Sequence, residues 1–195
     1  PAVNSILRTG SHLMTTLRDI DIEDLLRREP VQTDMQRIGE YINGARVLIT
    51  GGGGSIGSEL ARQIAKMSPA NLILVGKGEN SIYEIEQELQ QTLHVFPTCV
   101  IADVRDRASM ERVFEKYRPT VVFHAAAHKH VPLMQGNPIE AIKNNVLGTW
   151  TVADLAIKYG ASRFIYISTD KAVMPKSIMG ATKRVGEMIV ASLSK

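Results

Sequence analysis

The stretch RVLITGGGGSIG, residues 46–57, decides the fold of this chain. Its first five residues form a short apolar run, four glycines follow, and a helix-like pattern begins at Ser55. A glycine-rich turn between a buried strand and a helix gathers backbone N–H groups at the positive end of the helix dipole, where a pyrophosphate can bind. The segment therefore predicts a dinucleotide-binding strand–turn–helix unit.

The glycines of this turn fit two dinucleotide-binding spacings: GxGxxG, which starts at Gly52, and TGxxGxxG, which starts at Thr50. Both end on Gly54, which lets the backbone approach phosphates, and Gly57, which allows close packing of helix and strand. A triphosphate-hydrolysing loop would carry Lys where Ser58 stands, so that class is disfavoured. A purely structural turn is the alternative. We predict cofactor contacts at Thr50, Gly51, Gly54, Ser55, Ile56 and Gly57.

Beyond this turn, apolar runs alternate with segments of helical periodicity. The runs cover 46–50, 71–75, 96–102, 120–124 and 163–168, and the helical segments start near Ser55, Ser81, Arg107, Pro138 and Ser177. Continuous apolar strands that alternate with helices indicate a parallel sheet covered on both faces, built by right-handed crossovers. We predict an α/β, doubly wound Rossmann domain over residues 44–195.

Residues 1–43 carry no strand signal. Apolar residues spaced three and four apart predict short helices at 20–28 and 34–42, separated by Pro30, which we interpret as an N-terminal helical arm. Pro1 is not an initiator methionine, and Lys195 falls inside an expected helix with no Gly or Asn stop signal after it. We therefore expect a piece of a longer protein that lacks a C-terminal substrate region.

The composition is that of an ordinary globular protein, with 44% hydrophobic and 22% charged residues. Without a signal-peptide layout or an apolar run long enough for a bilayer, we expect a cytoplasmic protein with no membrane contact in this segment. Cys99 is a lone cysteine in an apolar run, so we predict a buried strand residue. Seven basic residues against two acidic ones from Lys158 onward suit a diphosphate ligand or a solvated helix face. Nucleic acid is disfavoured because no aromatic residues lie among the basic ones.

Further cofactor contacts are predicted at the ends of the second and third strands. An acidic residue that would bind the NAD ribose is missing at Gly76, and Lys77 could pair with a 2′-phosphate, so we favour NADP weakly. Glu79 could still reach the ribose, which leaves NAD open. Asp103 and Val104 end the third strand, where the adenine edge is held in such folds. The alternative for Asp103 is a turn or a helix cap.

The fourth strand opens into AAAHKHVP, residues 125–132. The small side chains of Ala125, Ala126 and Ala127 leave room for the nicotinamide ribose. Lys129 and His130 are placed to face a substrate, whereas His124 is interpreted as a core residue. Three histidines could suggest zinc, but no carboxylate or thiol cluster supports them, so we predict no metal.

The motifs AAAHKHVP (125–132), NNVLGT (144–149), STDKAV (168–173) and MGATKR (179–184) resemble those of the UDP-N-acetylglucosamine 4,6-dehydratases. These enzymes form part of the polysaccharide-biosynthesis branch of the extended short-chain dehydrogenases. The similarity spans roughly residues 18–195, and RDIDIEDLL at 18–26 resembles the linker before the catalytic domain of large membrane-attached members. The resemblance implies a UDP-sugar substrate, bound NAD(P), a homo-oligomer, and a parent at the cytoplasmic face of the membrane.

The resemblance also implies a reaction: oxidation at C4 of the sugar, loss of water across C5 and C6, and hydride return to C6. Asp170 would protonate the departing hydroxyl, Lys171 would assist at C5, and Thr169 would relay a proton. Ser168 and Asn145 would bind the sugar, and Lys183 would hold the nicotinamide ribose. For Asp170 and Lys171 the alternative is a structural ion pair or a helix cap, and for Lys183 a solvated surface position.

Two positions depart from the general pattern. Met179 stands where short-chain dehydrogenases carry a catalytic tyrosine, and a thioether cannot accept the C4 hydroxyl proton. That proton must then go to Asp170, to Lys171 or to water held by Thr169, so we interpret Met179 as a subtype marker within the catalytic set. Gln135 stands where members of the resembling family often carry Glu, so no carboxylate role is expected at this position. The rival functions are a nucleotide-sugar 4-epimerase, which would need Tyr at position 179, and a non-catalytic dinucleotide-binding module.

Overall fold

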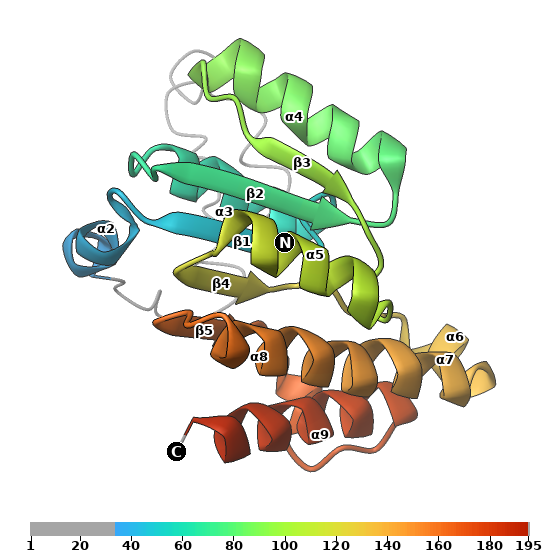
Figure 1. Cartoon of the computed structure of the whole chain (residues 1–195). Helices are drawn as coiled ribbons and strands as arrows, with labels where there is room; N and C mark the ends of the chain where they lie inside the picture. The colour runs from blue at the N-terminus through green and yellow to red at the C-terminus, as the bar shows by residue number, and fades with distance from the viewer. Residues whose placement is uncertain (1–33, 195) are drawn as a thin grey trace, which may run out of the picture. The chain divides into compact units, whose positions relative to one another are not determined.

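The computed structural model describes residues 34–194 (Figure 1). The chain divides into two compact units, Pro1–Met35 and Gln36–Lys195. The helix predicted at 34–42 is confirmed as α2 (Met35–Ile42). The helix predicted at 20–28 lies outside the described residues.

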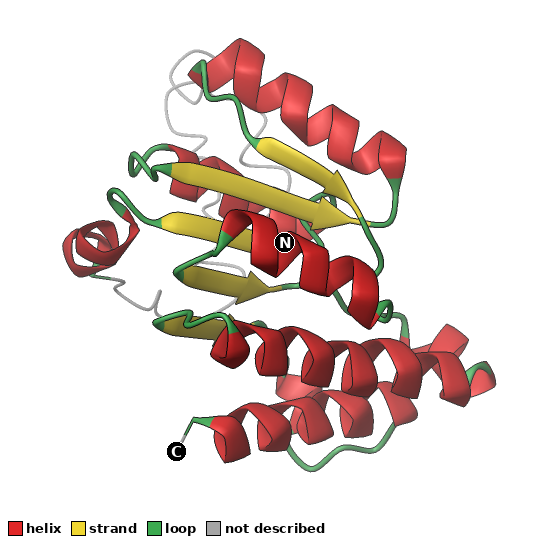
Figure 2. Cartoon of the chain, viewed as in Figure 1, coloured by secondary structure: helices red, strands yellow, loops and turns green. Residues whose placement is uncertain are grey.

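Five parallel strands form one sheet in the order β3-β2-β1-β4-β5 (Figure 2). They are β1 (Arg46–Thr50), β2 (Asn71–Gly76), β3 (Thr98–Ile101), β4 (Val121–His124) and β5 (Arg163–Tyr166). The chain builds outward from β1 through β2 to β3 and then crosses back to β4, so the strand order reverses between β1 and β4. In such sheets ligands bind outside the carboxyl ends of the strands at this reversal. The predicted doubly wound fold is confirmed.

Helices cover both faces of the sheet. The core on one face is built with α3 (Ser55–Ala65) and α4 (Glu79–Leu93), and on the other with α5 (Arg107–Tyr117) and α8 (Gly148–Lys158). Within β1, Val47 and Ile49 pack into the first core and Leu48 into the second. Because alternate side chains of a strand point to opposite faces, a strand buried on both faces must be apolar throughout. This explains the uninterrupted apolar runs.

The connection from β4 to β5 is more complex than the single helix predicted near Pro138. It comprises α6 (Val131–Gly136), α7 (Pro138–Ile142), the π-helix η2 (Lys143–Leu147) and then α8. Single π-turns inside α-helices occur frequently at functional sites. The sequence pattern indicated neither α6 nor η2.

After β5 the chain forms the short 3₁₀ turn η3 (Asp170–Ala172) and the long helix α9 (Ile178–Leu193). The helix predicted near Ser177 is confirmed, since the Ser177 hydroxyl caps α9 by accepting a hydrogen bond from the Gly180 N–H at 3.1 Å. Figure 1 shows α9 running alongside α8, past the β5 edge of the sheet. The start of α9 thus lies next to the carboxyl end of β5.

Cys99 lies in β3 as predicted but is only half-buried, and this burial raises the pKa of its thiol to about 12. Among residues 34–194, no helix combines the length and hydropathy needed to cross a membrane.

Candidate functional site

The glycine turn leads from the carboxyl end of β1 into α3 and needs glycine at several positions, among them Gly51 and Gly57. Gly51 has a positive φ of 71°, and a Cβ there would lie 2.8 Å from the backbone nitrogen of Ala126. A Cβ on Gly57 would lie 2.0 Å from the carbonyl oxygen of Gly51. The turn is therefore folded against itself and against the chain leaving β4.

The amino end of α3 is open to a ligand. Gly54 is its N-cap residue, and no side chain in the described part of the chain caps this end. The first turn of a helix leaves N–H groups without intrahelical partners, and these carry the positive end of the helix dipole. Residues Ser55, Ile56 and Gly57, predicted as cofactor contacts, form this first turn. A bare N-terminus beside a tight glycine turn fits a diphosphate.

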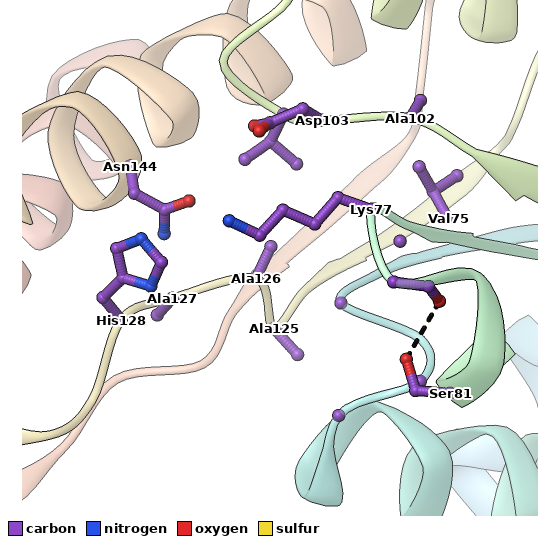
Figure 3. A pocket seen from close by; sticks show the side chains of 16 residues that line it. Val75, Lys77, Ser81, Ala102, Asp103, Ala125, Ala126, Ala127, His128 and Asn144 are labelled. Atoms are coloured by element: carbon purple, nitrogen blue, oxygen red, sulfur yellow. Dashed lines mark hydrogen bonds between the residues drawn. The ribbon is translucent and has the colours of Figure 1, made fainter. Parts of the chain in front are cut away.

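A pocket of about 310 Å³ opens beside this turn (Figure 3). The residues predicted as cofactor contacts that line it are Gly51, Gly54, Lys77, Asp103, Val104, Ala125, Ala126 and Ala127. The pocket also has lining residues that the sequence reasoning missed, namely Gly53, Val75, Gly76, Gly78, Ser81, Ala102, His128 and Asn144. Pockets that hold small ligands start at about this size, so the space fits part of a dinucleotide.

Titratable side chains converge on the pocket from the ends of β2, β3 and β4. Lys77 extends across it from the end of β2 toward Asn144 and His128 (Figure 3). Asp103 accepts hydrogen bonds from the Arg105 guanidinium at 2.7 to 3.0 Å, which lowers the pKa of the Asp103 carboxyl. The pKa of His128 is lowered by burial and by the charges of Lys77 and Arg105. The pocket thus has a cationic side toward Lys77 and holds His128 toward its neutral form.

Beneath the pocket lies a buried hydrogen-bonded chain centred on His124, which confirms the prediction of a core residue. Its Nδ1 lies 2.6 Å from the Thr50 hydroxyl, and its Nε2 lies 3.0 Å from the Thr149 hydroxyl. Thr149 donates its single hydrogen to the carbonyl of Asn145 at 2.7 Å, so it must accept from Nε2. We infer that His124 is neutral with the proton on Nε2. Burial lowers its pKa to about 3.

Two residues predicted to contact a ligand, Thr50 and Asn145, have their side chains buried in this hydrogen-bonded network. The Thr50 side chain is fully buried against His124, so only the backbone of Thr50 is placed to contribute to a cofactor site. Asn145 was expected to bind the sugar, but its side chain is 1% exposed and engaged on all sides. Its amide donates to the His128 carbonyl and the Thr182 hydroxyl, and its oxygen accepts from the His128 N–H. In this structure Asn145 ties the loop after β4 to α9, while its neighbour Asn144 lines the pocket.

The residues after β5 lie at the same carboxyl rim of the sheet, but in open surroundings. The Asp170 carboxylate lies 3.9 Å from the Lys171 ammonium, and their side chains are 83% and 56% exposed. The Thr169 hydroxyl donates to Asp170 at 2.9 Å. Ser168 donates to Glu187 of α9, which also pairs with Arg184 at 2.9 Å. Lys129 and His130, expected to face the substrate, are exposed and lie outside the lining of the pocket.

Two side chains of α9 are buried instead of exposed. Met179 is 3% exposed and packs with Met134 and Ala141 in a small apolar cluster. Lys183 is 5% exposed, and its ammonium donates to the carbonyl of Ile167, which excludes the alternative of a solvated surface lysine. Burial lowers the pKa of Lys183 to about 8, against the opposing influence of Glu187. Of the residues 34–194, no three His, Cys, Asp or Glu side chains are grouped as metal ligands.

Comparison with known proteins gives relatives named for polysaccharide biosynthesis, for 4,6-dehydration and for 4-epimerisation of nucleotide sugars. The chain is 48% identical over its whole length to the capsular polysaccharide biosynthesis protein CapD of Staphylococcus aureus, covering 33% of that protein. It is 51% identical over 95% of its length to the probable polysaccharide biosynthesis protein EpsC of Bacillus subtilis, covering 31% of it. It is 35% identical over 75% of its length to a UDP-N-acetylglucosamine 4,6-dehydratase (inverting) of Campylobacter jejuni, covering 43% of that enzyme. The chain thus spans about a third of the length of CapD and EpsC.

Solved structures share the fold over about half of their length. A UDP-glucose 4-epimerase of Thermotoga maritima with UDP-glucose has a TM-score of 0.68 at 26% identity, over 76% of this chain and 50% of that one. A UDP-glucose 4-epimerase of Thermus thermophilus in complex with NAD has a TM-score of 0.65 at 25% identity, over 75% and 50%. The model of the family described as "Polysaccharide biosynthesis protein" matches residues 47–195, nearly the whole of the sheet and its helices. The chain belongs to this polysaccharide biosynthesis protein family.

Proposed function

We propose that this chain is the cofactor-binding and acid–base portion of a nucleotide-sugar 4,6-dehydratase that converts UDP-N-acetylglucosamine into a UDP-4-keto-6-deoxy sugar. The observation that carries the proposal is the pair Asp170 and Lys171, which follows β5 directly at the sheet rim that also holds the glycine turn. A 4-epimerase would need a tyrosine at position 179, and Met179 is a buried core residue instead. The chain is 35% identical to the Campylobacter dehydratase and 32–33% identical to UDP-glucose 4-epimerases of Rickettsia, so residue 179 carries the choice between the two.

The bound cofactor is proposed to be NAD. The uncapped start of α3 would take the diphosphate, Asp103 and Val104 the adenosine end, and Ala125–Ala127 the nicotinamide ribose. When bound, a nicotinamide supplies a hydride acceptor for C4 and later a donor for C6. The Thermus epimerase structure contains NAD, and the weak preference for NADP drawn from Lys77 has no support among the relatives.

The side chains after β5 would handle the protons. Asp170 would donate a proton to the departing C6 hydroxyl, and Lys171 would take part in removing the C5 proton. Thr169 donates to Asp170 and so can hand on a proton without moving far. The hydroxyl of Ser168 already donates to Glu187, so a sugar hydroxyl bound here would join that pair.

The test uses UDP-N-acetylglucosamine that carries deuterium at C4. A dehydratase yields a product 18 Da lighter with the deuterium moved to C6, because the hydride taken from C4 returns there. An epimerase yields UDP-N-acetylgalactosamine of unchanged mass with the deuterium still at C4. Mass spectrometry and NMR of the product from the complete protein separate the two, and retention at C4 would overturn the proposal.

The isolated chain is expected to bind NAD(P) with little or no turnover, which corresponds to the non-catalytic alternative. Asp170 and Lys171 are exposed, and charges in water act on a reacting group far more weakly than charges in an enclosed site. Denaturing the purified chain and identifying the released small molecule by mass spectrometry would reveal carried-over cofactor. Robust product formation by the 195 residues alone would contradict this expectation.

A further inference from the structure

The ring of Tyr166, the last residue of β5, contacts two buried side chains, His124 and Lys183. One is the His124 ring, with centroids 5.8 Å apart and planes inclined by 22°. The other is the ammonium of Lys183, whose nitrogen lies 3.9 Å from the centre of the Tyr166 ring. The strand thus ends in an aromatic surface that carries a cation.

Lys183 has few other ways to satisfy its charge. The side chain is 5% exposed, and an ammonium carries three hydrogens, one of which is donated to the Ile167 carbonyl. The acidic side chain whose charge acts on it is Glu187, which already holds Ser168 and Arg184. Its other titratable neighbours are Tyr166 and the neutral His124. The negative face of an aromatic ring attracts a cation most strongly when the cation is desolvated, so the ring is a substantial partner.

Helix α9 is shaped to receive this ring. A Cβ on Gly186 would lie 2.2 Å from the Tyr166 hydroxyl oxygen, so the tyrosine occupies the space that the glycine leaves. The Tyr166 hydroxyl lies 3.5 Å from the carbonyl of Lys183, at the edge of hydrogen-bond range. The ring is therefore seated on the same helical turn that carries the lysine, and its orientation is determined from both sides.

We propose that Tyr166 is a positioning residue, whose ring face holds the Lys183 ammonium at the carboxyl end of β5, where it can reach the cofactor ribose. Met179, one turn earlier on α9, has no group that could orient the ammonium, and β5 supplies it instead. The link to the ribose rests on the proposed function. The contact between the ring and the ammonium does not.

The test replaces Tyr166 without changing its shape. Tyr166→Phe keeps the ring face and loses the hydroxyl, and Tyr166→fluorinated phenylalanine, with one to three fluorines, weakens the ring's negative face in steps. Lys183 is titrated by NMR of ¹³C-labelled lysine in the free protein, with exposed lysines such as Lys158 as internal controls. NAD affinity is measured by calorimetry at pH 7 for the same series.

We expect Tyr166→Phe to titrate as wild type, and the fluorinated series to lower the Lys183 midpoint stepwise by up to about one pH unit. NAD affinity should fall in parallel by about fivefold, which matches about 1 kcal/mol. An unchanged Lys183 midpoint across the series would overturn the proposal, and so would an equal loss in Tyr166→Phe, which would assign the effect to the hydroxyl. A shifted midpoint with unchanged NAD affinity would overturn the positioning role. The Lys183 titration is measured in the free protein, so its result does not depend on whether the protein is a dehydratase.

Discussion

The glycine turn and the turn after β5 lie at the same rim of the sheet and are built in opposite ways. The first is enclosed by backbone, to the point that a single added carbon on Gly57 meets a carbonyl oxygen at 2.0 Å. The second presents Asp170 and Lys171 on a three-residue 3₁₀ turn with most of their surface exposed. Packing specifies the first region, and side-chain chemistry specifies the second. Cofactor binding and proton transfer should therefore be separable by mutation.

The strongest test of this separation is Asp170→Asn. If Asp170 is the acid, turnover in the complete protein should fall by about 10²- to 10⁴-fold, the range of general acid–base contributions, because an amide cannot donate the proton. NAD affinity should stay within twofold, since Asp170 lies outside the lining of the pocket proposed to hold the cofactor. Product formation and calorimetry on the same preparation measure both. Normal turnover in Asp170→Asn together with loss in Lys171→Ala would remove Asp170 from the acid role.

The converse test is Gly57→Ala. The added methyl group forces the turn open against the Gly51 carbonyl, so NAD affinity should fall by about 100-fold, equivalent to almost 3 kcal/mol. The melting temperature should fall as well. Gly136→Ala is the matched control, because no atom lies within 4 Å of a Cβ there. Wild-type affinity in Gly57→Ala would show that the turn is less constrained than its geometry implies.

A third test asks whether the buried layer beneath the pocket responds to acid. The folded-state pKa of His124 is about 3, below the ordinary value of 6.5, so the unfolded chain binds the proton more readily between these pH values. His124 should therefore remove about 1.4 kcal/mol of folding free energy for each unit that the pH falls from 6.5 toward 3. Urea unfolding of wild type and His124→Asn at pH 6.5 and 4.5 gives the difference in slope.

The control for this experiment is His130→Gln, which removes an exposed histidine. It should retain the wild-type pH dependence. Equal slopes in wild type and His124→Asn would mean that the fold tolerates a charged imidazole at this position, contrary to the hydrogen-bonded chain inferred from Thr50, Thr149 and Asn145.

The smallest expected effect concerns Lys77, an exposed side chain that lines the pocket beside the glycine turn. If it pairs with a 2′-phosphate, Lys77→Ala should weaken NADP binding by up to about fivefold, the value of an exposed ion pair near 1 kcal/mol. NAD binding should change less than twofold. Equal changes for the two cofactors, in parallel fluorescence titrations, would show that Lys77 does not discriminate between them.

The sequence predicted the regular parts of the fold well because their signals are local. Apolar runs of strand length gave all five strands, with the ends of β3 and β5 placed one or two residues too far out. The glycine spacing located the turn, and the small residues Ala125–Ala127 located the floor of the pocket. Each of these inferences needed only the residue types and the periodicity of one segment.

What the sequence did not reveal depends on contacts between distant segments. Asn144 and Asn145 are adjacent and identical, yet Asn144 lines the pocket while Asn145 is hydrogen-bonded to His128 and Thr182, within a π-helix that no local pattern indicates. Lys183 belongs to a helix whose polar face would normally be solvated, and its burial follows from Tyr166 on another element. The hydrogen bond from Ser168 to Glu187 joins the loop after β5 to α9. No local pattern carries such information.

The π-helix makes the spacing of residues 143–147 as important as their identity. Each residue turns a regular helix by about 100°, so deleting one here to restore α-helical geometry would rotate the asparagines away from their partners while leaving every remaining side chain chemically intact. An insertion elsewhere in α7 or α8 would restore the number of residues but not the direction in which these asparagine side chains point. Engineering of this chain should therefore keep the length of segment 143–147 unchanged, whereas its exposed side chains can be exchanged.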